Sequence, residues 1–146
     1  MKTTLCAVDF SNLSDLALNL AVQLAEALKT RLLLIHVAPH AEQIGESELN
    51  MTYKMFLDEC EEKLRDLDVP EHLETEYRVV VGKSPAGLIL GEATKEHVEL
   101  IVIGSHGRTG LGRLLLGSVA ENVLRGAACP VIVVKDPHLL DQTATD

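Results

Sequence analysis

Short aliphatic runs and amphipathic helical patterns alternate along the chain, and this alternation limits the folds that it can adopt. From Leu13 to Leu28, apolar residues recur at spacings of three and four, which predicts a helix. The run from Arg31 to Val37 has no polar face, which is typical of a strand buried on both sides. Such an order predicts an α/β fold, with a parallel sheet, right-handed crossovers and helices on both faces. The expected strands are 3–8, 31–37, 74–81, 100–103 and 131–134.

The length and composition agree with a single domain. A chain of 146 residues can bury one sizeable core, and two domains would be cramped. Hydrophobic residues make up 47% of the chain and aromatic residues only 3%, so Leu, Val, Ile and Ala must build this core. We expect one domain over residues 1–135, followed by a loose acidic tail over 136–146.

Two strand orders are common for a doubly wound sheet of this size, 2-1-3-4-5 and 3-2-1-4-5, and the strand pattern alone leaves both open. In the second order, the first and fourth strands are neighbours, and the winding of the chain reverses between them. Asp9 and Gly104 then flank one crevice, at the point where open α/β sheets bind ligands.

Charge and cysteine usage exclude several classes of function. Thirteen basic and 22 acidic residues give a net charge of −9, which opposes binding to nucleic acid or to an anionic membrane surface. The three cysteines are widely separated, without metal-ligand spacing, which suits a reducing compartment. The apolar run near the N-terminus ends at Asp9, too early for a signal peptide. We therefore expect a cytoplasmic protein without nucleic-acid partners or membrane insertion.

A glycine-rich segment follows the fourth expected strand, and it has the chemistry of a phosphate-binding loop. Gly104 and Gly107 allow backbone amides to approach an anion, and glycine also admits the positive φ that turns successive amides inward. Arg108 and Arg113 add positive charge within the loop. Ser118 and Glu121 have the spacing of a capping box, which places a helix start, with its free amides, beside the loop. His106 is either a phosphate contact or an exposed loop residue.

Two better-known nucleotide motifs do not fit. Gly82-Lys83-Ser84 matches the end of a Walker A motif, but Tyr77 stands where that motif needs its first glycine. Gly110 and Gly112 begin a dinucleotide fingerprint, but Leu115 occupies its third glycine position. Both motifs are therefore rejected.

The spacing Gly104-x2-Gly107-x9-Gly117-Ser118 resembles the ATP-binding signature of the universal stress protein (UspA-like) family. The resemblance extends over nearly the whole chain, since Ala7-Val8-Asp9, His36-Val37 and Gly82 also fall at landmarks of that family. Cys129-Pro130 and the aliphatic run after it complete the match. Two positions depart from the family pattern: Ala7 stands where many members have proline, and Phe10 where many have glycine.

This resemblance implies an adenine nucleotide alpha hydrolase-like sheet of order 3-2-1-4-5, with ATP in the crevice between strands one and four. It implies that Asp9 and the backbone of Val37 hold the adenosine end, and that the glycine-rich segment holds ribose and phosphates. The expected ATP-binding residues are Asp9, Val37, Gly104, Gly107, Arg108, Gly117, Ser118 and Val119. It also implies a homodimer formed by antiparallel pairing of the last strand, through Val131, Ile132, Val133 and Val134.

Two classes of function remain open. One is an ATP-binding regulatory or stress-response module, with a protein partner such as a transporter or regulator. The other is a slow ATPase or nucleotidyl-transfer enzyme on the same fold. Efficient phosphoryl transfer needs a residue that orients water or an acceptor, and the loop has no carboxylate. We therefore expect no catalytic residues, weak hydrolysis at most, and no protein metal site, with any Mg or Mn ion carried by the triphosphate.

Overall fold

The computed structural model describes residues 1–41, 50–106 and 116–136, in which strands and helices alternate as expected. No expected strand differs from the observed one by more than one residue at either end. The elements are β1 (Thr3–Ala7), α1 (Asn12–Leu28), β2 (Arg31–Ala38), α2 (Asn50–Arg65), β3 (Thr75–Val81), α3 (Pro85–Lys95), β4 (Leu100–Gly104), α4 (Ser118–Gly126) and β5 (Val131–Val134).

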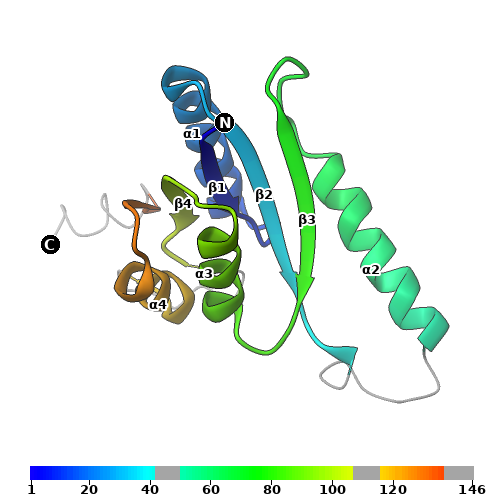
Figure 1. The fold of residues 1–146 in the computed structure, drawn as a ribbon. Helices are drawn as coiled ribbons and strands as arrows, with labels where there is room; N and C mark the ends of the chain where they lie inside the picture. Colours follow the sequence, from blue (N-terminus) through cyan, green and yellow to red (C-terminus); the bar gives the residue numbers. More distant parts are fainter. Residues whose placement is uncertain (42–49, 107–115, 137–146) are drawn as a thin grey trace, which may run out of the picture.

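The strands form one five-stranded sheet in the order β3-β2-β1-β4-β5, and every pairing is parallel (Figure 1). This confirms the order 3-2-1-4-5 and excludes 2-1-3-4-5. The central strand β1 pairs with β2 on one side and β4 on the other, so that Cys6 lies opposite Leu34 and Val102. The carboxyl ends of β1 and β4 therefore lie side by side at the point where the winding reverses.

Two helices cover each face of the sheet, and each pair encloses its own hydrophobic core (Figure 1). On the α1 and α2 face, Leu34 and Val102 pack with Leu18 and Leu64 of the helices. On the α3 and α4 face, Ile35 and Ile101 pack with Ile89 and Val123. Strand side chains alternate between the two faces, so each central strand contributes to both cores. Among the described residues, no helix is long and apolar enough to cross a membrane.

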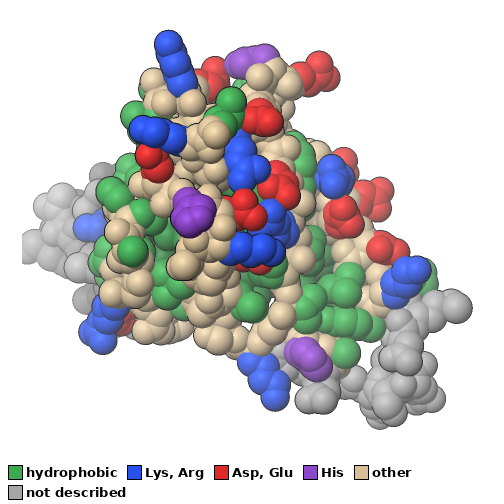
Figure 2. All heavy atoms as spheres, viewed as in Figure 1, with side chains coloured by type: hydrophobic (Ala, Val, Ile, Leu, Met, Phe, Trp, Pro, Cys, Tyr) green, Lys and Arg blue, Asp and Glu red, His purple; other side chains and the backbone are tan. Residues whose placement is uncertain are grey.

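The β3 edge of the sheet carries an ion-pair cluster on the α3 face, visible in the middle of the surface in Figure 2. Arg31 on β2 contacts Glu76 at 3.1 Å and Glu96 at 2.8 Å, and Arg78 on β3 also contacts Glu92 and Glu96. Burial disfavours the charged Arg78, but hydrogen bonds with Glu76 and Glu92 outweigh it and raise the Arg78 pKa. Through Glu92 and Glu96, the cluster links the C-terminal half of α3 to β2 and β3.

The cysteines belong to the packing of the domain. All three thiols are free, and burial raises the pKa of Cys6 to about 12. A thiol in this state is a small apolar side chain, because the reactive form is the thiolate. Cys6 is therefore a structural residue of the core.

Candidate functional site

A cavity of about 250 Å³ opens at the carboxyl ends of β1 and β4. The ends of β1, β2 and β4 contribute to its wall, together with the first turns of α1, α3 and α4. Two of the expected site residues, Gly107 and Arg108, lie outside the described residues. The other six line this cavity: Asp9, Val37, Gly104, Gly117, Ser118 and Val119.

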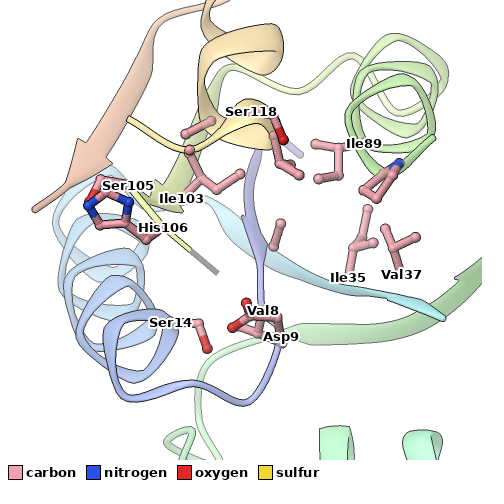
Figure 3. A pocket seen from close by; sticks show the side chains of 16 residues that line it. Val8, Asp9, Ser14, Ile35, Val37, Ile89, Ile103, Ser105, His106 and Ser118 are labelled. Carbon is pink, nitrogen blue, oxygen red and sulfur yellow. The ribbon is translucent and has the colours of Figure 1, made fainter. Parts of the chain in front are cut away.

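Asp9 and Ser118 lie on opposite sides of the cavity (Figure 3). The Asp9 carboxylate is held by its own loop, because Oδ1 accepts a hydrogen bond of 3.0 Å from the Ser11 amide. The N-cap of α1 is Ser11, whose side chain accepts from the Ser14 amide, so Asp9 is not the cap. One side of the cavity therefore carries a fixed carboxylate.

The opposite side is the N-terminus of α4, and its start differs from the expected capping box. The N-cap is Gly117 rather than Ser118, and no side chain bonds to the cap. Gly117 has an extended backbone (φ −75°, ψ 167°), and its carbonyl accepts from the Glu121 amide at 3.0 Å. Ser118 is thus the first helical residue, and Glu121 lies one position too far along for a capping box. Without a capping side chain, the first amides of α4 are directed towards the cavity as possible anion donors.

At the two described glycines of the loop, a Cβ would make close contacts, and neither glycine has a positive φ, which corrects the expectation for Gly104. A Cβ on Gly104 would lie 3.2 Å from the Leu13 side chain, and one on Gly117 would lie 3.1 Å from the Ser105 carbonyl. The Gly117 amide also donates to that carbonyl, at 2.6 Å. These glycines bring the end of β4, the start of α1 and the start of α4 together.

A third side of the cavity is apolar, and sequence reasoning did not assign most of it. Ile35 and Val37 on β2 and Ile89 on α3 lie together in Figure 3, with Pro85 also in the wall. The strand order could have predicted this side of the cavity. The connection from β3 to β4 crosses β2 and β1, and it places α3 over the crevice. An apolar slot beside one carboxylate suits a flat, partly polar ring.

Ser105 and His106 also belong to the wall, and their polar atoms are buried. Within the described residues, the Ser105 hydroxyl and both ring nitrogens of His106 have no hydrogen-bond partner. His106 is half-buried and lies at the same side of the cavity as Ser105 (Figure 3), so it is not the exposed loop histidine that the sequence allowed. Buried polar groups normally have partners, which makes these atoms candidates for ligand contacts.

The described part of the chain offers no group of three or more His, Cys, Asp or Glu side chains placed to hold a metal ion. Asp9 is the single carboxylate among the described residues of the wall. The described wall thus offers one carboxylate, one imidazole, hydroxyl groups, backbone amides and apolar side chains, which can bind and orient a ligand.

Comparisons with known proteins find similar sequences and similar folds. The family model described as the Universal stress protein family matches residues 1–135. The chain is 33% identical over 143 residues to Universal stress protein YxiE of Bacillus subtilis, covering 90% of this chain and 97% of that one. It resembles the structure of the universal stress protein from Archaeoglobus fulgidus in complex with dAMP, with 26% identity, a TM-score of 0.63, and coverage of 92% and 98%. Another similar structure is a universal stress protein in complex with cAMP, with 26% identity, a TM-score of 0.62, and coverage of 91% and 95%.

Proposed function

The chain belongs to the universal stress protein family, and we propose that its cavity binds an adenine nucleotide, with ATP as the expected ligand. The observation that carries the proposal is the placement of Asp9 opposite the uncapped N-terminus of α4 across one cavity. A carboxylate accepts hydrogen bonds from ribose hydroxyls or an amino group, whereas helix amides bind phosphate. The ends of the cavity therefore suit the ends of a nucleotide, and the apolar side at Val37 suits the base.

Structures with adenine nucleotides support this assignment, since the similar proteins named above carry dAMP and cAMP. Both ligands consist of adenine on a pentose that carries a single phosphate. In this chain, the residues expected to extend the site towards a triphosphate include Gly107 and Arg108, which lie outside the described residues. ATP and AMP are therefore both required in the binding test, and a higher affinity for ATP would support a role for the loop.

We propose a regulatory role in which bound nucleotide changes the association of the protein with itself or with a partner. The single described carboxylate of the wall lies on the opposite side from Ser118 (Figure 3), away from the expected phosphates. No described carboxylate of the wall is therefore placed to orient water at a γ-phosphate. Slow hydrolysis is the alternative, and rapid turnover of ATP by the isolated protein would overturn the regulatory proposal. The free cysteines suit a cytoplasmic location.

A homodimer formed through β5 is part of the same proposal. β5 is an edge strand of four aliphatic residues, all of them half-buried. Its carbonyls at Pro130 and Val134 accept from β4, so the backbone groups of Val131 and Val133, which alternate with them, point away from β4. An exposed aliphatic edge of this kind is a template for a second strand, and antiparallel pairing with a second copy would cover it.

Binding is tested by calorimetric titration of ATP, AMP and GTP, after acid extraction has removed any nucleotide that co-purifies. We expect adenine nucleotides to bind and to raise the melting temperature. Asp9→Asn should weaken ATP binding about 10- to 100-fold, the effect of losing a hydrogen bond to a charged group. Asp15→Asn is the matched control, because Asp15 is an exposed carboxylate in the first turn of α1, the helix that follows the Asp9 loop. Wild-type protein that neither binds ATP nor gains thermal stability from it would overturn the proposal.

A further inference from the structure

His36 lies on β2 immediately before Val37, with its ring on the opposite face of the sheet from the cavity. Its neighbours at alternate positions, Leu32 and Leu34, belong to the core beneath α1 and α2. The imidazole Nδ1 is 2.9 Å from the carbonyl oxygen of Val8. Val8 lines the cavity and directly precedes Asp9. His36 thus contacts the segment that carries Asp9, from the face of the sheet that α1 and α2 cover.

The chemistry of this contact defines the tautomer. A carbonyl oxygen can only accept, so Nδ1 must carry a proton and donate it to Val8. Val8 is also held through its amide, which donates to the Ile35 carbonyl at 2.8 Å. One residue is therefore anchored to β2 at both backbone groups, once by the strand ladder and once by a side chain.

This arrangement also affects Val37. The β1–β2 pairing ends at Ala7 and Ile35, and the next ladder bond of a parallel pair would run from the Val37 amide to the Val8 carbonyl. In the described residues, no such bond forms, and the Val8 carbonyl bonds to the imidazole. The Val37 amide lies beyond the ladder, in the wall of the cavity, where a ligand can accept from it.

Phe10 holds the imidazole in place. The two ring centroids are 4.4 Å apart, and the Lys63 ammonium lies 5.8 Å from the centroid of the Phe10 ring. Phe10 has a φ of 66°, in the left-handed region that residues other than glycine rarely adopt. The backbone turn at Phe10 brings its ring back onto the imidazole, so the loop on either side of Asp9 is attached to His36.

We propose that His36 is a positioning residue for the nucleotide site. Its Nδ1–H holds the Val8 carbonyl, which fixes the direction of the Asp9 carboxylate and leaves the Val37 amide available for the adenine ring. This inference rests on the proposed function, because it assigns a role in the same site. It does not depend on any contact between His36 and the nucleotide.

The test compares His36→Asn with His36→Leu. The Asn amide nitrogen occupies nearly the position of Nδ1 and can donate to Val8, whereas Leu has a similar size and no donor. Both variants lose the ring contact with Phe10. We expect His36→Leu to weaken ATP binding about 10-fold, and His36→Asn to stay within about threefold of the wild type. The urea midpoint of each variant is measured alongside, so that affinity is compared between fully folded proteins.

A second measurement needs no nucleotide. Nitrogen-15 NMR of the wild-type imidazole reports which ring nitrogen carries the proton, and we expect a protonated Nδ1. An unprotonated Nδ1, or equal ATP affinity in the Leu and Asn variants, overturns the positioning role. Wild-type protein that binds no adenine nucleotide overturns the proposed function instead, while the NMR result still decides whether the contact with Val8 exists.

Discussion

The amide of Gly117 donates a 2.6 Å hydrogen bond to the carbonyl of Ser105, which ties the end of β4 to the start of α4. Both residues line the cavity. A Cβ on Gly117 would lie 3.1 Å from the same carbonyl oxygen, a tighter contact than a side chain normally makes. The geometry of the cavity at the start of α4 therefore depends on the absence of a side chain at this residue.

Substitution of Gly117 should weaken nucleotide binding more than it weakens the fold. In Gly117→Ala, the Cβ must displace the Ser105 carbonyl by a few tenths of an ångström, which moves the first amides of α4. In Gly117→Val, two more methyl groups enter the same space. We expect a graded loss of ATP affinity in calorimetric titrations, with binding abolished in the valine variant and the far-UV circular dichroism of the wild type retained.

Gly91→Ala is the control for this prediction. Gly91 lies in α3, and a Cβ there would meet no atom within 4 Å apart from its chain neighbours and the backbone of its own helix. Alanine in the interior of a helix stabilises by about 0.5–1 kcal/mol relative to glycine. The Gly91 variant should therefore bind ATP normally and melt at a slightly higher temperature. Normal ATP binding in Gly117→Val would show that ATP binding does not require the close contact between Gly117 and Ser105.

The sheet was predictable because its signals are local and repeated. Each aliphatic run marks a strand, and the resemblance of the loop to a known signature selected between two strand orders. The start of α4 was not predictable from local signals, because the Ser118 and Glu121 spacing of a capping box points to Ser118 as the cap, whereas the cap is Gly117. The choice of Gly117 depends on its bond to Ser105, a residue twelve positions earlier in the sequence. The α3 side of the cavity was missed for the same reason, since Ile89 reaches the cavity only through the order of the strands.

The Phe10→Gly variant should be more stable to unfolding than Phe10→Ala. At most positions, alanine is the more stabilising of the two residues. A left-handed backbone costs a residue with a side chain about 1–2 kcal/mol, and Phe10 has a φ of 66°. Phe10→Ala and Phe10→Gly both lose the ring contact with His36, so both should be less stable than the wild type. Glycine alone relieves the backbone strain. We expect Phe10→Gly to exceed Phe10→Ala by about 1 kcal/mol in the free energy of unfolding in urea.

Gln23 provides the comparison for ordinary backbone. It is exposed in the interior of α1, where alanine should be more stable than glycine by about 1 kcal/mol. If the alanine and glycine variants differ in the same direction at Phe10 and at Gln23, the strain at Phe10 is absent in solution.

Glu96→Gln should reduce stability at neutral pH and have less effect in acid. The hydrogen bond from Arg78 lowers the pKa of Glu96 below its ordinary value of 4.5, and the bond from Arg31 acts in the same direction. A carboxyl whose pKa is lower in the folded state stabilises the fold above its ordinary pKa, and this contribution is lost as the pH falls through the folded value. The urea midpoints of wild type and variant should therefore differ at pH 7 and converge as the pH falls below the lowered pKa of Glu96.

The control for Glu96 is Glu61→Gln, which removes an exposed i,i+4 pair with Arg65 on α2. Such a pair contributes only about 0.3–0.5 kcal/mol. A loss of stability in Glu96→Gln no larger than in the control, or one that does not shrink in acid, would contradict the role assigned to the cluster.

Proline substitutions along β5 can separate the proposed dimer contact from the fold. The backbone of Val133 points away from β4, so Val133→Pro removes an amide donor from the free edge and leaves the β4–β5 ladder in place. The backbone of Ile132 points towards β4, so Ile132→Pro removes a ladder bond within the sheet. In sedimentation velocity, we expect a dimeric wild type and a folded, monomeric Val133→Pro. Ile132→Pro should lose stability in urea. A Val133→Pro protein that remains a dimer would place the contact between copies elsewhere on the surface.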